Sequence, residues 1–121
     1  MICDASIQTF MLTHWVRDRD RGEKIPLEFA VKRMTKDTAD LYDLRDRGVI
    51  EVGKKADLNL IDLENLRLEP PEMINDLPAG GRRFMQRARG YRATIVSGEV
   101  TMENDEITGV YPGKLIRGPQ R

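Results

Sequence analysis

The chain has 121 residues, which suffices for one domain or for a piece of one. Its 20 basic and 20 acidic side chains give a net charge of zero, which argues against a dedicated nucleic-acid binder and leaves only a local basic patch open. The single cysteine, Cys3, excludes an internal disulfide framework and fits a reducing compartment.

No apolar run approaches the roughly 20 residues that a membrane-spanning helix needs. The first residues also lack the basic stretch and apolar run of a signal peptide. We therefore expect a cytoplasmic protein with no membrane partner.

The pattern at the start of the chain predicts a helix over residues 4–17. Apolar residues such as Ile7, Phe10 and Trp15 recur there at helical spacing. The charged run over residues 17–22 interrupts this pattern, so we expect the helix to end in it.

A second helix is predicted to begin at Pro26, because the missing N–H of proline costs nothing in a first helical turn. Its apolar stripe consists of Leu27, Val31 and Met34. A further short helical turn carries Leu41, and Gly48 ends the helical part.

From Gly48 onward the composition changes to turns and strands. Residues 48–62 form a turn-rich segment leading into a strand, in which Leu58 and Leu60 alternate with polar residues and predict one buried face. Residues 69–72 and 77–81 have the Pro and Gly content of loops.

The strongest strand signal lies over residues 93–102, which predict a hairpin around the two-residue turn Ser97-Gly98. Residues 104–106 predict a second turn, followed by a strand over residues 107–110. Helices first and strands later indicate an α+β fold. We divide it into a helical segment, residues 1–47, and a small β-domain with long irregular loops, residues 48–121.

Two residue types that often carry chemistry occur only once in the chain. His14 could be a ligand or a general base, but a partly buried helix position beside Trp15 is the favoured interpretation. A hydrolytic zinc site takes about three protein ligands, so one histidine and one cysteine do not supply it. Cys3 lacks an obvious activating base nearby and is expected to be inert.

The strongest positive cluster lies over residues 82–92. It consists of Arg82, Arg83, Arg87, Arg89 and Arg92, with Phe84 and Tyr91 between them. Aromatic and basic residues in this pattern could bind a nucleic acid by stacking and phosphate contacts. The neutral chain favours the alternative, in which the arginines form a solvated face or pair with carboxylates such as Asp76.

Several segments, taken in order, resemble one group of enzymes, the N-acyl-D-amino-acid deacylases (D-aminoacylases) of the amidohydrolase superfamily. The most specific segment reads G-x-I-x-x-G-x-x-A-D-L from Gly48 to Leu58. The full set covers residues 12–17, 27–35, 48–62, 76–83, 94–100 and 108–114.

The resemblance implies a zinc-dependent hydrolase of N-acyl-D-amino acids or related amides. In that family a (β/α)8 barrel is followed by a small β-sandwich, so this chain would contain the last barrel helices and a partial sandwich. The metal ligands and catalytic aspartate of the family precede the matched region, so no catalytic or metal residue is carried over to this chain. Cys3, Asp4 and His14 are the residues expected to line the mouth of the site in the larger enzyme.

A chain of this kind would be incomplete by itself. Helix faces and strand edges that the barrel would cover stay open, and such surfaces favour association with another chain, so we expect a homo-oligomer. Two hypotheses stand side by side: the C-terminal portion of an amidohydrolase that is inactive alone, and a free-standing binding or assembly module that uses the Arg82–Arg92 patch.

Overall fold

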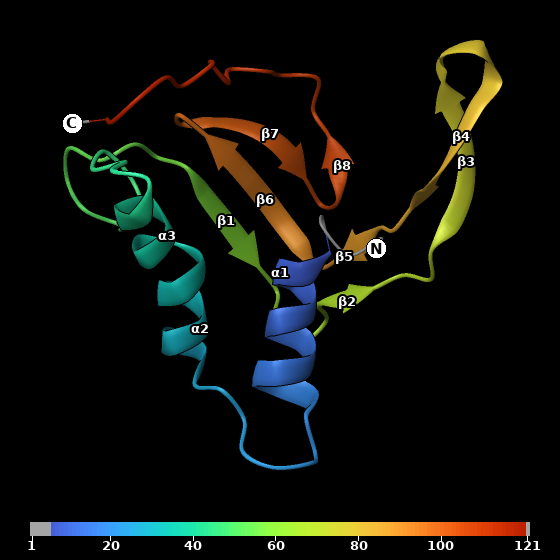
Figure 1. The fold of residues 1–121 in the computed structure, drawn as a ribbon, viewed down its shortest axis with the longest axis horizontal. Coiled ribbons are helices and arrows are strands. Elements are labelled where there is room, and N and C mark those ends of the chain that lie inside the picture. The colour runs from blue at the N-terminus through green and yellow to red at the C-terminus, as the bar shows by residue number, and fades with distance from the viewer. Residues whose placement is uncertain (1–5, 121) are drawn as a thin grey trace.

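The computed structural model describes residues 6–120, with three helical segments on one side of a small set of antiparallel strands (Figure 1). The first helix is continuous from α1 (Ile7–Phe10) into η1 (Met11–Asp18), which winds as a wider π-helix. Its end is marked by the Arg19 amide, which donates to the carbonyl oxygen of His14 at 2.8 Å. The helix predicted over residues 4–17 is therefore confirmed, and it ends in the charged run as expected.

The helix buries only part of its apolar stripe. Its buried residues are Thr9, Leu12 and Thr13, whereas Ile7 is 51% exposed and Phe10 is 43% exposed. Thr13 tolerates burial because its hydroxyl donates to the Thr9 carbonyl oxygen at 3.0 Å, and the Thr9 hydroxyl is hydrogen-bonded to that of Tyr91. Ile7 and Phe10 thus have little cover among the described residues.

The second helix, α2 (Leu27–Met34), follows Pro26 as predicted, and α3 (Lys36–Leu41) comes directly after it. The apolar stripe of α2 is largely open, because Leu27 and Val31 are both more than a third exposed. Each helix buries one alanine, Ala30 in α2 and Ala39 in α3, and small side chains allow close helix packing but contribute little core.

A four-stranded antiparallel sheet forms the centre of the second half of the chain. Its order is β1-β6-β7-β8, with β1 (Leu58–Ile61), β6 (Tyr91–Val96), β7 (Glu99–Glu103) and β8 (Glu106–Ile107). Ser97 and Gly98 both have positive φ in the β6–β7 turn, as a tight hairpin turn requires. The predicted hairpin is confirmed. The predicted second turn is present at Asn104 and Asp105, but the strand after it covers only two residues.

The single buried face predicted for the strand at Leu58 is wrong. Leu58 is half-buried, but Leu60 is 62% exposed.

Residues 69–85 are more regular than their loop-like composition predicted. β3 (Glu72–Leu77) and β4 (Gly81–Met85) pair as an antiparallel hairpin around the short helical turn η2 (Pro78–Gly80), and we call residues 72–85 the arm. At its base, β2 (Arg67–Leu68) pairs with β5 (Ala88–Arg89). Figure 1 shows the arm standing away from the rest of the molecule, on the side opposite α2 and α3.

The predicted α+β class is confirmed, with the helices before the short antiparallel strands. The division into units at residue 48 stays a prediction. The hydrophobic core is small and consists of Leu12, Ala30, Ala39 and Leu66. Within the described part of the chain, no helix is both long enough and apolar enough to cross a membrane.

Candidate functional site

Of the three predicted site residues, the structure describes His14. Cys3 and Asp4 lie outside the described residues. His14 lies on η1, where its ring stacks on Phe10 with 5.0 Å between centroids and meets the edge of Trp15 at 5.2 Å. Such packing fixes the imidazole as part of an aromatic cluster, which Arg19 extends by covering the Trp15 ring at 4.7 Å.

The donor set needed for a metal centre is not assembled here. Among residues 6–120, no three His, Cys, Asp or Glu side chains come together as a group that could hold an ion. Because a hydrolytic zinc site takes about three such ligands, the described residues do not fit zinc by themselves. The described residues therefore do not form a metal-dependent catalytic centre by themselves.

An open groove of about 490 Å³ lies between α1 and the strands. Thr9 on the helix and Tyr91 on β6 both line it, and their hydroxyl groups are hydrogen-bonded at 2.7 Å. This contact ties the first helix to the central sheet across 82 positions of sequence. Arg89 and Met102 also line the groove, which gives it mixed polar and apolar walls.

One wall of the groove is held by a carboxylate at a turn. Asp105 has a φ of +67°, and its side chain accepts hydrogen bonds from the amides of Gly90 and Tyr91 at 3.0–3.2 Å. A carboxylate whose oxygens already accept these amides is positioned to hold the wall in place.

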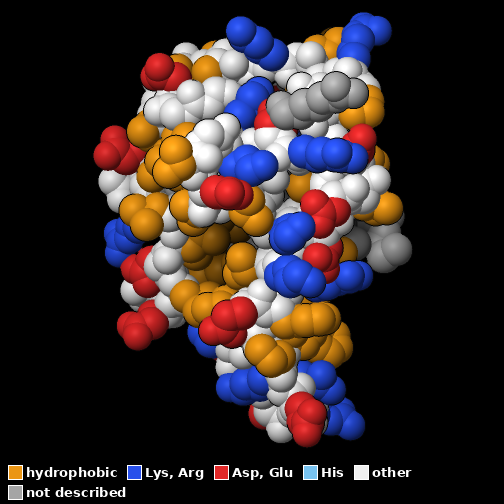
Figure 2. Space-filling model, turned by 90° about the vertical axis from the view of Figure 1, so that its left-hand side faces the viewer, with side chains coloured by type: hydrophobic (Ala, Val, Ile, Leu, Met, Phe, Trp, Pro, Cys, Tyr) orange, Lys and Arg blue, Asp and Glu red, His pale blue; other side chains and the backbone are white. Residues whose placement is uncertain are grey.

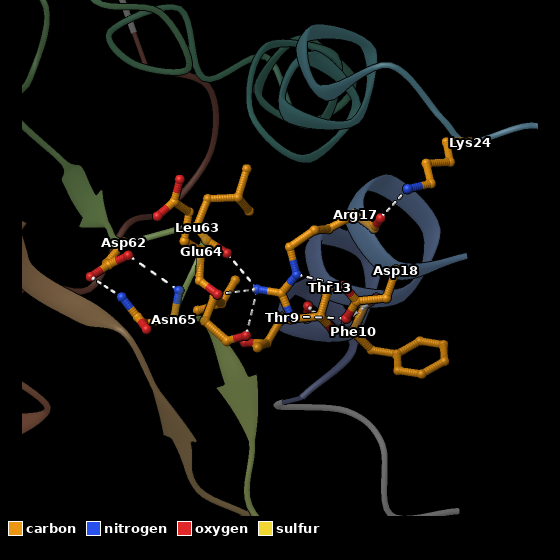
Figure 3. Close-up of polar contacts among 11 residues, drawn as sticks. Thr9, Phe10, Thr13, Arg17, Asp18, Lys24, Asp62, Leu63, Glu64 and Asn65 are labelled. Carbon is orange, nitrogen blue, oxygen red and sulfur yellow. Dashed lines mark hydrogen bonds and ion pairs between the residues drawn. The ribbon is translucent and has the colours of Figure 1, made fainter. Parts of the chain in front are cut away.

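Arg17 closes the loop that follows β1 (Figure 3). One nitrogen of its guanidinium donates to three loop carbonyl oxygens, those of Leu63, Glu64 and Leu66, the last at 2.9 Å. The other nitrogens form a bidentate pair with Asp18 at 2.6 and 2.8 Å. Arginine suits this task because its planar fork presents five donors in fixed directions.

The same loop is closed on its other side by Asp62. Its carboxylate accepts from the Asn65 side chain and amide and from Arg92, and these hydrogen bonds hold the pKa of Asp62 below its usual range. Leu66 is fully buried here, and the backbone of Gly90 lies so near it that a Cβ on Gly90 would be 2.8 Å from the Leu66 Cα. We call residues 62–66, with Arg17 and Gly90, the junction.

The arginine cluster predicted as a possible binding patch is largely neutralised by acidic neighbours. Four of its five members have a carboxylate partner: Arg83 with Asp76, Arg87 with Glu72, Arg89 with Glu69 and Arg92 with Asp62. Within residues 6–120, Arg82 alone of the five has no such partner. Paired arginines offer little net charge to a phosphate backbone.

Sequence reasoning did not single out Thr9, Arg17 or Asp105. Threonine on a helix and arginine in a charged run are common surface residues, so no local pattern marks them. A signal did exist for Asp105, because Asn-Asp in a tight turn often uses its side chain to bind backbone amides.

Comparison with known proteins adds the family context. The family model described as "Amidohydrolase family" matches residues 3–102. Over 63 residues the chain is 43% identical to the 5'-deoxyadenosine deaminase of Methanobrevibacter smithii, which is 50% of this chain and 13% of that enzyme. The chain thus spans a small part of the length of this curated relative. No solved structure matches the chain.

Proposed function

The chain belongs to the amidohydrolase family, and from this premise we propose that it is the C-terminal portion of a zinc-dependent enzyme that hydrolyses N-acyl-D-amino acids or related amides. In this proposal the catalytic groups and the zinc ligands come from residues outside this chain. The observation that carries the proposal is the family match over residues 3–102, which contains five of the six ordered segments that resemble D-aminoacylases.

The exposed apolar faces of the helices support this role. Ile7 and Phe10 on the first helix and Leu27, Phe29 and Val31 on α2 are each at least 38% exposed. On the side where α2 and α3 lie, hydrophobic side chains surround a hollow (Figure 2). Exposed apolar surface around such a hollow marks a contact with another part of a protein. We propose that the rest of the catalytic domain packs here.

The reaction proposed for the whole enzyme adds one water molecule across an amide C–N bond. The acyl carbon gains the hydroxyl oxygen and leaves as a carboxylate, while the nitrogen gains a proton and leaves as the free amine of the amino acid. This chain would contribute a surface against which the catalytic domain packs. Cys3, Asp4 and His14 would border the mouth of the site. With its single cysteine the enzyme is proposed to act in the cytoplasm.

Deamination is a second candidate, favoured by the similarity to 5'-deoxyadenosine deaminase. That reaction also replaces a C–N bond with water, but it releases ammonia from a ring carbon instead of an amino acid from an acyl group. The match covers 13% of that enzyme, so the order of the segments along the whole chain favours the amide substrate.

The alternative of a free-standing binding module that uses the Arg82–Arg92 patch has less support. Four of its five arginines are already paired with carboxylates, which removes most of the charge that would attract an anionic partner.

The test is to read the coding frame upstream of Met1, and to purify the chain both alone and with that upstream part. We expect His-x-His and Ser-Asp-Gly motifs upstream, zinc only in the longer protein, and hydrolysis of N-acyl-D-amino acids only by that protein. Release of ammonia from 5'-deoxyadenosine without amide hydrolysis would favour the deaminase. Stoichiometric zinc and turnover with the 121-residue chain alone would overturn the proposal.

A further inference from the structure

Residues 110–120 leave the sheet after β8 and return to the helices. They contain no helix or strand, and Figure 1 shows them passing from β8 to a place beside the end of α3. Pro112 and Pro119 lack the N–H that a sheet ladder needs. We propose that these residues, which we call the latch, are a conformational device that closes on the end of α3 and opens without unfolding the sheet. This inference concerns conformation and does not depend on the proposed reaction.

The far end of the latch, residues 118–120, has the shape of a hook. Gly118 has a φ of +69°, and the ring of Pro119 restricts the backbone angle after it. The side-chain amide of Gln120 donates to the carbonyl oxygens of Gly118 and Pro119, both at 3.1 Å. These contacts are all local, so the hook keeps its shape when it is not bound and loses little conformational freedom on binding.

The hook binds the turn that ends α3. Asp43 follows the helix in the left-handed conformation, with φ +54°, and the Leu44 amide donates back to the Ala39 carbonyl oxygen at 2.9 Å. The Asp43 carbonyl oxygen accepts from the Gln120 amide at 3.0 Å, and the Arg45 amide donates to the Gln120 carbonyl oxygen at 2.9 Å. Together these two bonds form a parallel bridge between Leu44 and Gln120. The hook is therefore held through backbone atoms at the C-terminal end of a helix.

Between its two ends the latch is held loosely. An open groove of about 400 Å³ lies between it and the sheet, lined by Met102 of β7 and by Tyr111 of the latch. Tyr111 is 80% exposed and Leu115 is 77% exposed. Among the described residues, no backbone hydrogen bond joins residues 111–119 to another segment. The two bonds of the hook therefore act against the conformational entropy of the whole segment, and the latch can open by itself.

Closure of the latch strengthens the connection between the helices and the sheet. The turn that receives the hook continues into residues 46–57, where the Asp57 carboxylate accepts from the Ser97 amide at 2.8 Å and from Arg47 at 3.0 Å. The connection is thus held by the β6–β7 turn at one end and by the latch at the other. When the latch opens, the contact at Asp57 remains. The end of α3 then loosens while the junction stays closed.

The first test measures amide hydrogen exchange by NMR in the 121-residue chain. The Arg45 amide reports the latch, and the Asp62 amide, which donates to the Gly90 carbonyl oxygen at 2.8 Å, reports the junction. A chain that ends at Arg117 lacks the hook. In it the exchange of Arg45 should accelerate by roughly tenfold or more, since this amide loses its hydrogen bond. The exchange of Asp62 should stay within about twofold.

Two substitutions at position 120 separate the backbone contacts of the hook from its side-chain contacts. Gln120→Pro removes the N–H that donates to Asp43, and it should accelerate the exchange of Arg45 nearly as much as the shortened chain does. Gln120→Ala is the matched control, because it keeps both backbone bonds and loses only the contacts within the hook. Its effect on Arg45 should be smaller, roughly threefold.

The second test locks the latch in a Cys3→Ser background, which removes the native thiol. Leu44→Cys and Gln120→Cys together place two thiols across the parallel bridge, where neighbouring strands lie about 4.8 Å apart. The oxidised chain should exchange the Arg45 amide roughly tenfold more slowly than the same chain reduced, because the disulfide removes the open state. The reduced chain is the control, since it carries the same substitutions.

Three results would overturn the proposal. The first is an unchanged exchange of Arg45 in the chain that ends at Arg117, because the hook then protects nothing. The second is an equal acceleration of Arg45 and Asp62 in that chain, because the latch then does not open separately from the junction. The third is an Arg45 amide that exchanges equally fast in the oxidised and the reduced double-cysteine chain, because the latch then has no open state for the disulfide to remove.

Discussion

The junction and the arm are held together in opposite ways. At the junction, segments far apart in sequence meet: Arg17 caps a loop 46 to 49 positions later, and Gly90 lies against the backbone of Leu66. In the arm, every ion pair joins residues of one hairpin or its base, such as Asp76 and Arg83, seven positions apart. The junction contacts are also less exposed than those of the arm, since Leu66 is fully buried and the Arg17 side chain is 28% exposed.

The difference separates global from local stability. Long-range contacts around a buried residue must form for the helices and the sheet to adopt their relative positions, so the junction determines the stability of the chain. Local contacts on an exposed ribbon add little to that stability, so the arm can open without the junction. Substitutions in the two regions should therefore have different kinds of effect.

The largest effect is expected from Gly90→Ala. A Cβ at this position would lie 2.8 Å from the Leu66 Cα and 3.0 Å from its amide nitrogen, and neither backbone atom can move easily. With φ at +107° in addition, we expect a loss of about 3 kcal/mol in the free energy of unfolding. Urea unfolding monitored by Trp15 fluorescence measures it.

Gly98→Ala is the matched control for this prediction. Gly98 also has positive φ, at +87°, but nothing lies within 4 Å of the position its Cβ would take. Gly98→Ala should lower the free energy of unfolding by about 1 kcal/mol, because its only cost is that of an alanine at positive φ. Equal losses at Gly90 and Gly98 would show that the close approach to Leu66 does not limit stability.

A smaller effect is expected from Arg17→Met, which keeps the apolar stem of the side chain but removes all its donors. The carbonyl oxygens of Leu63 and Leu66 then lose a partner in a part-buried place, which should cost about 1–3 kcal/mol. The measurement is again the free energy of unfolding.

Arg83→Met in the arm is the comparison variant for Arg17→Met. Arg83 also holds a bidentate pair, but its partner Asp76 is an exposed carboxylate that water solvates once the arginine is gone. We expect a clearly smaller loss than for Arg17→Met. A loss as large as that of Arg17→Met would contradict the separation between junction and arm.

The sequence predicted the parts of this fold that rest on local signals. Helical spacing over residues 4–17 located the first helix, and Ser97-Gly98 located the central hairpin, because only residues that accept positive φ form such a turn. Local signals did not predict how much of the helix face is buried. That depends on what covers the helix, and Ile7 and Phe10 have little cover within the described chain.

The candidate site was less predictable than the fold for a related reason. Pairing of an arginine of the cluster with Asp76 was anticipated, and Arg83, seven positions later, is that partner. The contacts of Arg17 with the junction and of Thr9 with Tyr91 join positions 46 to 82 residues apart, and no single-sequence pattern encodes them. The arm was missed because its Pro and Gly residues indicated loops, while in the structure they form its turn at Pro78–Gly80.

The smallest effect concerns the pH dependence of the arm. The hydrogen bond from Arg83 lowers the pKa of the Asp76 carboxyl below its ordinary value of 3.8. Because the folded pKa is the lower one, the stabilisation is complete above 3.8 and is lost as the pH falls through the folded pKa. Carboxyl carbon NMR should show Asp76 titrating below 3.8 in the wild type and close to 3.8 in Arg83→Gln. The junction also holds a carboxyl with a lowered pKa, Asp62, so low pH by itself does not separate the two regions. Arg83→Gln at neutral pH removes the hydrogen bond of the arm alone, and it should lower the hydrogen-exchange protection factors in the arm and leave those of the junction unchanged. Loss of protection in both regions in this variant would mean that the arm and the junction unfold as one unit, and the contrast between them would not hold.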